Sequence, residues 1–536
     1  MNDAPRSPGV VAPAAAGVAA VALGAGLGEL VSGIFAPAAS PFAVIGGALI
    51  DAAPSWAKDA AIALFGTADK IALLVGIGIV LLIVAGIAGW LEARKAPWGR
   101  VIVLAMGAVG AVVAMTRAEA SSLSWLPSVV AGVTGAAALM WLVRLVLRRS
   151  PARATPQESA ALGVAESDTP DAAPNVLSSA RPDRRSFLIW SGVATGVGVA
   201  AAFAGSALRA GSRSVTVIRD VLTLPRATGT APAVPASADF GIDGLAPVIT
   251  PNADFYRIDT ALIAPQIDPA DWSLRIHGDV EQEVTLTWDE LVALPLGESI
   301  TTLACVSNPV GGDLIGTAVW LGYPIRELLA RAKPTADADM VLSRSIDGFT
   351  ASTPLEVLTD ERDAVLAIGM NGQPLPIEHG FPVRMVVPGL YGYVSATKWV
   401  TELEVTRFDK ATAYWTDRGW SEEGPVKLQS RIDVPRGRQS VPAGETVIAG
   451  VAWQQHVGVS GVEVQIDEGA WQKAELATPI SDDTWVQWRF VWDAVPGDHT
   501  VRSRATSRTG EVQTDVQRAV VPSGATGHHE VTISVS

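Results

Sequence analysis

The sequence predicts three structural classes in succession: an all-α transmembrane region, an α+β domain and an all-β sandwich of immunoglobulin type. Residues 1–209 are dominated by Ala, Val, Gly, Leu and Ile, which gives the whole chain a positive mean hydropathy of +0.30. Charge divides the chain at the same place. The first 209 residues hold 15 of the 40 basic and 12 of the 54 acidic side chains, leaving 25 and 42 for the other 327. An acidic second half argues against nucleic acid or anionic lipid as its partner.

Five apolar segments predict helices that cross a bilayer, because each approaches the roughly 20 residues that such a crossing needs. They lie at 10–35, 71–91, 101–115, 126–147 and 189–208. The segment 41–65 is interrupted by a proline and by charges, so we expect an interfacial or re-entrant segment there. Lys and Arg gather after the second and the fourth segments, at 94–100 and 144–153. These loops are therefore expected to be cytoplasmic, with the N-terminus inside and the C-terminal half outside.

A second signal concerns export. Residues 150–183 are rich in Pro, Ala, Ser and Asp and predict a disordered cytoplasmic linker. The run Arg184-Arg185-Ser186-Phe187-Leu188 follows, directly before the fifth apolar segment. It resembles a twin-arginine export signal, whose route carries folded proteins. An ordinary positive-inside anchor is the alternative.

The second half of the chain alternates short β-branched runs with few helical ones, and this predicts the α+β domain. Strands are expected at 272–277, 284–288, 299–303, 340–344, 365–368, 383–387 and 399–405, and helices at 289–293, 325–332 and 354–359. Asn371-Gly372 predicts a tight turn between two of these strands. From about residue 430 only strands are expected, at 447–453, 462–466, 485–492, 500–504 and 531–535, which favours the sandwich.

Cys305 is the only cysteine, so it forms no intrachain disulfide. It ends a predicted strand and precedes a polar loop with Asn308, Gly311 and Gly312. A thiolate in such a place suits a metal ligand or a nucleophile, whereas a small buried hydrophobe is the plain structural alternative.

The residues around Cys305 decide between these interpretations. C-x-x-N followed by GG-x-x-I-G-x-A-x-W resembles the cofactor-binding core of the sulfite oxidase family of molybdenum enzymes, in which the cysteine sulfur binds molybdenum. The resemblance covers about residues 245–536. Its further motifs are PNADFY (251–256), MNGQPLP (370–376), EHGFPVRMVVPG (378–389), TKW (397–399), YWTDRGW (414–420) and SRIDVP (430–435).

The resemblance implies a molybdenum–molybdopterin cofactor with Cys305 as its metal ligand. The residues that it assigns to cofactor binding are Tyr256, Asp259, Cys305, Asn308, Asp347, His379, Arg384, Ala396, Thr397 and Lys398. Within this set it gives the phosphate end of the pterin to residues 396–398. Arg384 and Lys398 are credible phosphate partners by their charge, although a half-exposed strand residue and a surface lysine are the ordinary alternatives.

The chain departs from the family where substrate is chosen. Ile258-Asp259-Thr260 stands where the family has Arg-Asn-His, Pro309 and Val310 replace arginines, and Trp420 replaces a tyrosine. Sulfite needs a cationic pocket, so these changes predict oxygen-atom transfer on a small substrate that is not strongly anionic. The expected catalytic residues are Cys305, Tyr414, Arg418 and Trp420. Sulfite dehydrogenation and a non-catalytic, membrane-anchored binding protein are the alternatives.

The electrons are expected to leave through another protein. All six histidines lie after the last apolar segment, and there are no spare cysteines, so neither a haem nor an iron–sulfur cluster is expected. An external cytochrome is the expected partner and a membrane quinone the alternative, with a homodimer possible through the C-terminal domain.

The expected organisation follows from these segments. It comprises a four-helix transmembrane region (1–149), the linker (150–183), the signal-like fifth helix (184–209), an extracytoplasmic tether (210–244), the molybdopterin domain (245–425) and the immunoglobulin-like dimerisation domain (426–536).

Overall fold

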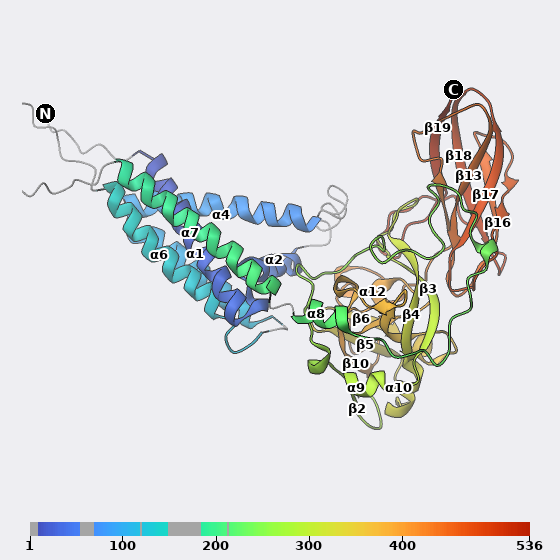
Figure 1. Ribbon diagram of the computed structural model, residues 1–536, viewed down its shortest axis with the longest axis horizontal. Helices are drawn as coiled ribbons and strands as arrows, with labels where there is room; N and C mark the ends of the chain where they lie inside the picture. Colours follow the sequence, from blue (N-terminus) through green and yellow to red (C-terminus); the bar gives the residue numbers. More distant parts are fainter. Residues whose placement is uncertain (1–8, 54–68, 118–119, 148–183, 212–213) are drawn as a thin grey trace, which may run out of the picture. The chain divides into compact units, whose positions relative to one another are not determined.

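The computed structural model describes residues 9–53, 69–117, 120–147, 184–211 and 214–536 (Figure 1). The described chain divides into two compact units, one made of the helices up to residue 211 and one that begins at residue 214. The predicted linker 150–183 lies outside the described residues.

The first unit is all helical. Its helices are α1 (Val11–Phe35), α2 (Pro41–Ala52), α4 (Asp69–Arg94), α5 (Trp98–Met115), α6 (Leu126–Leu147) and α7 (Arg184–Gly211). All but α2 are long and apolar enough to cross a membrane, and they cover the five segments expected from the sequence. The segment predicted as interfacial begins as the short helix α2, and its remainder from residue 54 lies outside the described residues.

Helix α1 is the centre of this unit, and its glycines bring three other helices against it. A Cβ on Gly17 would lie 1.9 Å from a carbonyl oxygen of α4. One on Gly24 would lie 2.4 Å from a carbonyl of α6, and one on Gly26 would lie 1.9 Å from a carbonyl of α7. Backbones approach this closely only where the side chain is absent, as in tightly packed transmembrane helices. Figure 1 shows α6 and α7 running beside α1.

An ion pair also joins α1 to α7. The Oε2 atom of Glu29 lies 2.6 Å from an Nη atom of Arg209, and Ser40 Oγ donates to Glu29 Oε1 at 2.7 Å. Glu29 is 3% exposed. A buried carboxylate is tolerable because its charge and its hydrogen-bonding capacity are both satisfied.

The α+β domain of the second unit contains two sheets. The first has the order β2-β1-β10-β5-β6 and includes a parallel pair, β1 with β10. Its strands are β1 (Ser273–Gly278), β2 (Val284–Thr287), β5 (Met340–Ser345), β6 (Thr350–Pro354) and β10 (Val400–Thr406). The second has the order β3-β4-β7-β8, with β9 beside β7. Its strands are β3 (Gly297–Ala304), β4 (Ile315–Pro324), β7 (Val365–Met370), β8 (Gln373–Pro374) and β9 (Arg384–Val386).

Short helices cover these sheets, namely α8 (Ser214–Val221), α9 (Trp288–Val292), α10 (Ile325–Ala332), α11 (Leu355–Thr359) and α12 (Gly392–Ser395). Local sequence explains several of them. Thr287 and Glu290 form a capping box at the start of α9. Helix α10 buries the residues of one face, Ile325, Leu328, Leu329 and Ala332. Asn371 and Gly372 both have positive φ and make the tight turn between β7 and β8.

Strands β4, β6 and the two-residue β8 of the α+β domain were not predicted. Eight of the ten residues of β4 are buried, so the strand lacks the alternation of apolar and polar residues by which a half-buried strand is recognised. All five residues of β6 are buried as well, and the helix predicted from 354 begins at Leu355, directly after this strand.

The C-terminal region is formed by two packed sheets. Their orders are β11-β13-β17-β16 and β12-β19-β18-β14-β15, with β12 parallel to β19. The strands are β11 (Gln429–Val434), β12 (Ser440–Val441), β13 (Gly444–Trp453), β14 (Val459–Ile466), β15 (Gln472–Lys473), β16 (Glu475–Leu476), β17 (Val486–Ala494), β18 (Gly497–Ser507) and β19 (His529–Val535). Ile448 and Trp488 from one sheet and Val464 and Ile533 from the other share a single core. This is the layered arrangement of a β-sandwich.

Candidate active site around Cys305

The β3–β4 hairpin delivers Cys305 to the site. Ala304 pairs with Ile315, so the loop 305–314 bridges two buried strands. The loop is closed by its own hydrogen bonds: Cys305 N–H donates to Leu314 O at 2.9 Å, and Leu314 N–H donates to Asn308 Oδ1 at 2.9 Å. Asn308 was expected to bind the cofactor, but in the structure its amide oxygen accepts a hydrogen bond that closes the loop.

The Cys305 thiol is 8% exposed, and burial raises its pKa, opposed by hydrogen bonding from Ser307 and by the charge of Lys398. At neutral pH the thiol is therefore protonated when no cation is bound to it. A metal that binds the thiolate must displace that proton and compensates the buried negative charge.

Aromatic rings and a neutral histidine lie beside the cysteine segment. The ring centroid of Phe255 lies 5.3 Å from that of Tyr256, 5.8 Å from that of Trp320 and 5.6 Å from that of His379. Burial and the nearby charges of Lys398 and Arg384 lower the pKa of His379 to about 3. Its Nδ1 is buried and has no hydrogen-bond partner among the described residues. A buried polar atom of this kind costs free energy unless a ligand satisfies it.

Three cations and one carboxylate lie next to His379. Lys398 Nζ lies 3.0 Å from Asp259 Oδ2, and Arg257 Nε lies 3.0 Å from the same oxygen. Arg384 is 4% exposed, and in the described part of the chain its guanidinium donates to backbone carbonyls, including that of His379 at 3.0 Å. Burial lowers the pKa of Arg384 to about 10 and that of Lys398 to about 8. The cluster carries an excess of two positive charges, which suits a buried phosphate.

A second group contains Tyr414, Arg418 and Trp420, which the sequence analysis expected to be catalytic. The guanidinium of Arg418 lies 3.6 Å from the ring centroid of Tyr414. Trp415 packs against two neighbouring rings, with its ring centroid 5.2 Å from that of Tyr414 and 6.0 Å from that of Trp420. Asp347 belongs to the turn between β5 and β6, where its Oδ1 accepts from Phe349 N–H, and the Phe349 ring lies 5.8 Å from Tyr414. Asp347 therefore lies close to this aromatic group.

Helix α12 lies between the two groups. A Cβ on Gly392 would lie 3.9 Å from both Ala304 O and the Tyr256 hydroxyl, while the Tyr393 ring lies 5.9 Å from Trp420. After the helix, Ala396 O accepts from Arg384 at 3.4 Å. The hydroxyl of Thr397 is hydrogen-bonded to Ser343 Oγ at 2.7 Å, so this side chain is already engaged within the domain.

Some contributors were missed by the sequence analysis. Burial raises the pKa of Tyr391 to about 12, opposed by a hydrogen bond from Lys427 N–H, and the nearby Cys305 adds a smaller increase. Arg431 and His529 of the sandwich contact the loop that follows Cys305. Arg431 lies in the SRIDVP motif, but neither this motif nor any other local signal relates the three residues to Cys305, because that relation arises through tertiary packing.

Comparison with known proteins connects this geometry to a family. The sequence model of the protein family described as the oxidoreductase molybdopterin binding domain matches residues 261–415. Mitochondrial sulfite oxidase of Mus musculus is 32% identical over 271 residues, which are 42% of this chain and 49% of that protein. The human enzyme is 32% identical over 289 residues, 45% of this chain and 52% of its own. The oxidoreductase YuiH of Bacillus subtilis is 31% identical over 157 residues, 29% of this chain and 76% of its own length.

Among solved structures, the sulfane dehydrogenase SoxCD from Paracoccus pantotrophus matches with a TM-score of 0.44 and 24% identity, covering 50% of this chain and 75% of that one. The chain spans about half the length of the sulfite oxidases that it matches.

These findings define an oxidoreductase that uses molybdopterin. The chain belongs to the family of molybdenum-dependent oxidoreductases that includes sulfite oxidase. Its own residues fit that cofactor: a buried thiol for the metal, an unsatisfied histidine nitrogen, and an excess of buried positive charge for the phosphate.

The charge cluster predicts how tightly the cofactor is held. Lys398→Met removes a buried cation, and the loss of a charge-assisted hydrogen bond should weaken cofactor binding roughly 10- to 100-fold. Lys410→Met is the matched control, because Lys410 is an exposed lysine paired with Asp279. Pterin fluorescence after gel filtration measures retention. Equal retention in the two variants would contradict the assignment of Lys398 to the phosphate.

Proposed function

We propose that this protein is a membrane-anchored, extracytoplasmic molybdenum enzyme that transfers an oxygen atom to or from a small substrate that is not strongly anionic. The observation that carries the proposal is the buried Cys305 thiol close to a cluster of buried, incompletely neutralised cations. A soft sulfur donor and a phosphate-binding group are the features that a molybdopterin cofactor requires.

Each residue of the site has a proposed role. When bound, the molybdenum cofactor supplies two-electron oxygen-atom transfer. Cys305 gives up its proton and offers the thiolate, which the loop hydrogen bonds to Leu314 and Asn308 hold in place. Arg384 and Lys398 bind the phosphate end, and Asp259 orients Lys398 through their ion pair. His379 remains neutral and uses its unsatisfied Nδ1 on the bound group.

The aromatic group around Trp420 is proposed to form the substrate wall. Trp420 is 6% exposed, and its ring packs against Trp415 and Tyr393, which excludes water from this side. Arg418 is the cation of this wall, but its charge lies over the Tyr414 ring, where a cation–π contact satisfies part of it. Pro309 and Val310 add no charge to the cysteine loop. This wall suits a weakly charged substrate better than a divalent anion.

Sulfite dehydrogenation is the alternative activity. The names of the sulfite oxidase relatives favour it, as does the excess positive charge near His379. Membership of an oxidoreductase family argues against the third interpretation, a non-catalytic binding protein.

The setting of the enzyme is also a proposal. The five apolar helices and the Arg184-Arg185 pair at the start of α7 support a multi-pass anchor with the second unit exported. The described residues 214–244 do not form the free tether that the sequence predicted at 210–244, because Arg219 Nε donates to Leu375 O at 2.8 Å and Thr228 N–H donates to Leu296 O at 2.7 Å. The membrane anchor itself would raise the local concentration of the site near a membrane-held cytochrome. The strand order of the C-terminal sandwich, with sheets A-B-E-D and A′-G-F-C-C′ when lettered along the chain, supports an immunoglobulin-like domain. A homodimer through this domain is proposed from the resemblance to the family alone.

The activity is tested with the molybdenum-loaded, full-length chain. A small neutral S-oxide or N-oxide, presented with a reductant, should turn over faster than sulfite presented with an artificial one-electron acceptor. Cys305→Ser should lower any such turnover by orders of magnitude while the chain remains folded. Faster oxidation of sulfite would favour the alternative activity. Efficient sulfite oxidation with a quinone analogue in place of the one-electron acceptor would contradict the proposed cytochrome partner.

The export proposal makes a separate prediction. Arg184→Lys combined with Arg185→Lys preserves both charges, so an ordinary positive-inside anchor should be unaffected. A twin-arginine signal should fail, because lysine lacks the guanidinium fork of arginine. Protease added to spheroplasts should cleave the second unit of the wild type but not that of the double variant. Equal cleavage would show that α7 is only an anchor.

A further inference from the structure

We propose that Arg431 and His529, both in the C-terminal sandwich, are positioning residues that clamp the loop of Cys305. The inference rests on the proposed function, since Cys305 is there the metal ligand. It gives the sandwich a role in the catalytic site itself, besides the dimerisation expected for it.

The sandwich first holds the strand that leads to the cysteine. At Thr302, three residues before Cys305, the N–H donates to Asp483 O at 2.9 Å, and Thr302 O accepts from Gln455 Nε2 at 3.2 Å. The Trp485 N–H donates to Thr302 Oγ1 at 2.9 Å. The groups that Thr302 presents on this side are thus bonded to sandwich residues, and β3 cannot shift without breaking these bonds.

The sandwich then holds the loop beyond the cysteine. Arg431 Nη1 donates to Gly312 O at 2.9 Å. Arg431 is itself held by an ion pair, in which its Nε lies 2.6 Å from Asp433 Oδ1, and both side chains are only 10% exposed. Asp433 also accepts from Ala246 N–H at 3.1 Å. A buried arginine with this much constraint offers a rigid donor to the loop carbonyl.

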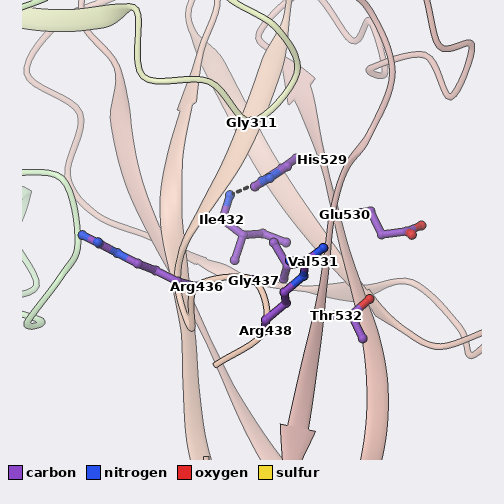
Figure 2. Close-up of a pocket in the computed structure, with 9 residues that line it drawn as sticks. All are labelled: Gly311, Ile432, Arg436, Gly437, Arg438, His529, Glu530, Val531 and Thr532. Atoms are coloured by element: carbon purple, nitrogen blue, oxygen red, sulfur yellow. Dashed lines mark hydrogen bonds between the residues drawn. The ribbon is translucent and has the colours of Figure 1, made fainter. Parts of the chain in front are cut away.

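His529 forms the surface on which the loop rests. Its Nδ1 accepts from Ile432 N–H at 2.9 Å, which orients the ring (Figure 2). A Cβ on Gly311 would lie 2.2 Å from His529 Cδ2 and Nε2, and Gly311 has φ +76°. Burial and the charge of Arg431 lower the pKa of His529 to about 4, so the ring is neutral there. A cavity of about 410 Å³ adjoins this contact, with Gly311 and His529 in its lining.

Together these contacts fix both ends of the segment 302–312, and Cys305 lies between them. Without the contact at Gly312 the loop would keep its packing on His529 and its internal hydrogen bonds, which join Cys305 to Leu314 and Asn308 and Pro309 to Gly312, but it would lose its side-chain hydrogen bond to the sandwich. The position of the sulfur would then vary, and water would reach the thiol more often. The clamp therefore predicts that the reactivity of Cys305 depends on residues of another domain.

The test uses the full chain without cofactor, where Cys305 is the only thiol. Alkylation by iodoacetamide requires the buried thiol to become accessible. Arg431→Gln should raise the alkylation rate roughly 10- to 100-fold. Arg431→Lys keeps a cationic donor and should restore part of the protection. Arg489→Gln is the matched control, because Arg489 lies on β17 of the sandwich in an exposed ion pair with Glu475, and its rate should equal the wild-type rate.

Thermal unfolding of each variant separates local opening from loss of the fold. Gly311→Ala provides a second perturbation that leaves all charges in place and should also raise the rate. If Arg431→Gln does not fold, the Lys and Gly311→Ala variants decide. Wild-type alkylation rates in folded Arg431→Gln and Gly311→Ala proteins would overturn the clamp. A wild type without molybdenum would overturn the proposed function but leave this thiol measurement valid.

Discussion

The buried thiol of Cys305 is the constraint on which the candidate active site depends. A small thiol packs easily in a core, but a thiolate there needs a compensating cation and a fixed geometry. The protein supplies the geometry through the closed loop 305–314 and through sandwich contacts on both sides of the cysteine. Lys398 and Arg384 add positive potential nearby, of which Asp259 neutralises only part. The arrangement is costly without a ligand, and a bound cofactor that carries both a metal and a phosphate group would relieve both costs.

How much the sequence could predict depended on the range of the interactions. The five apolar helices and the turn at Asn371-Gly372 are local features, and each was predicted at its place. The residues proposed to bind the cofactor were predicted from several short motifs in a fixed order, and the structure brings Tyr256, His379, Arg384 and Lys398 together.

The rest depended on packing between distant segments. Strand β4 is buried almost throughout and so lacks an alternating pattern. Arg431 lies on β11 and His529 on β19. The sequences of these strands do not indicate that the two side chains contact Gly312 and Gly311 of a distant loop. The local role of Asn308 was also hidden, since only the folded loop shows its amide oxygen bonded to Leu314 N–H.

The most direct test of the central claim is X-ray absorption at the molybdenum edge of the loaded wild type and of the Cys305→Ser variant. If the Cys305 thiolate binds the metal, the variant should retain the cofactor but lose one sulfur neighbour of molybdenum and gain an oxygen or nitrogen neighbour in its place. The same number of sulfur neighbours in both proteins, at the same distances, would contradict the account.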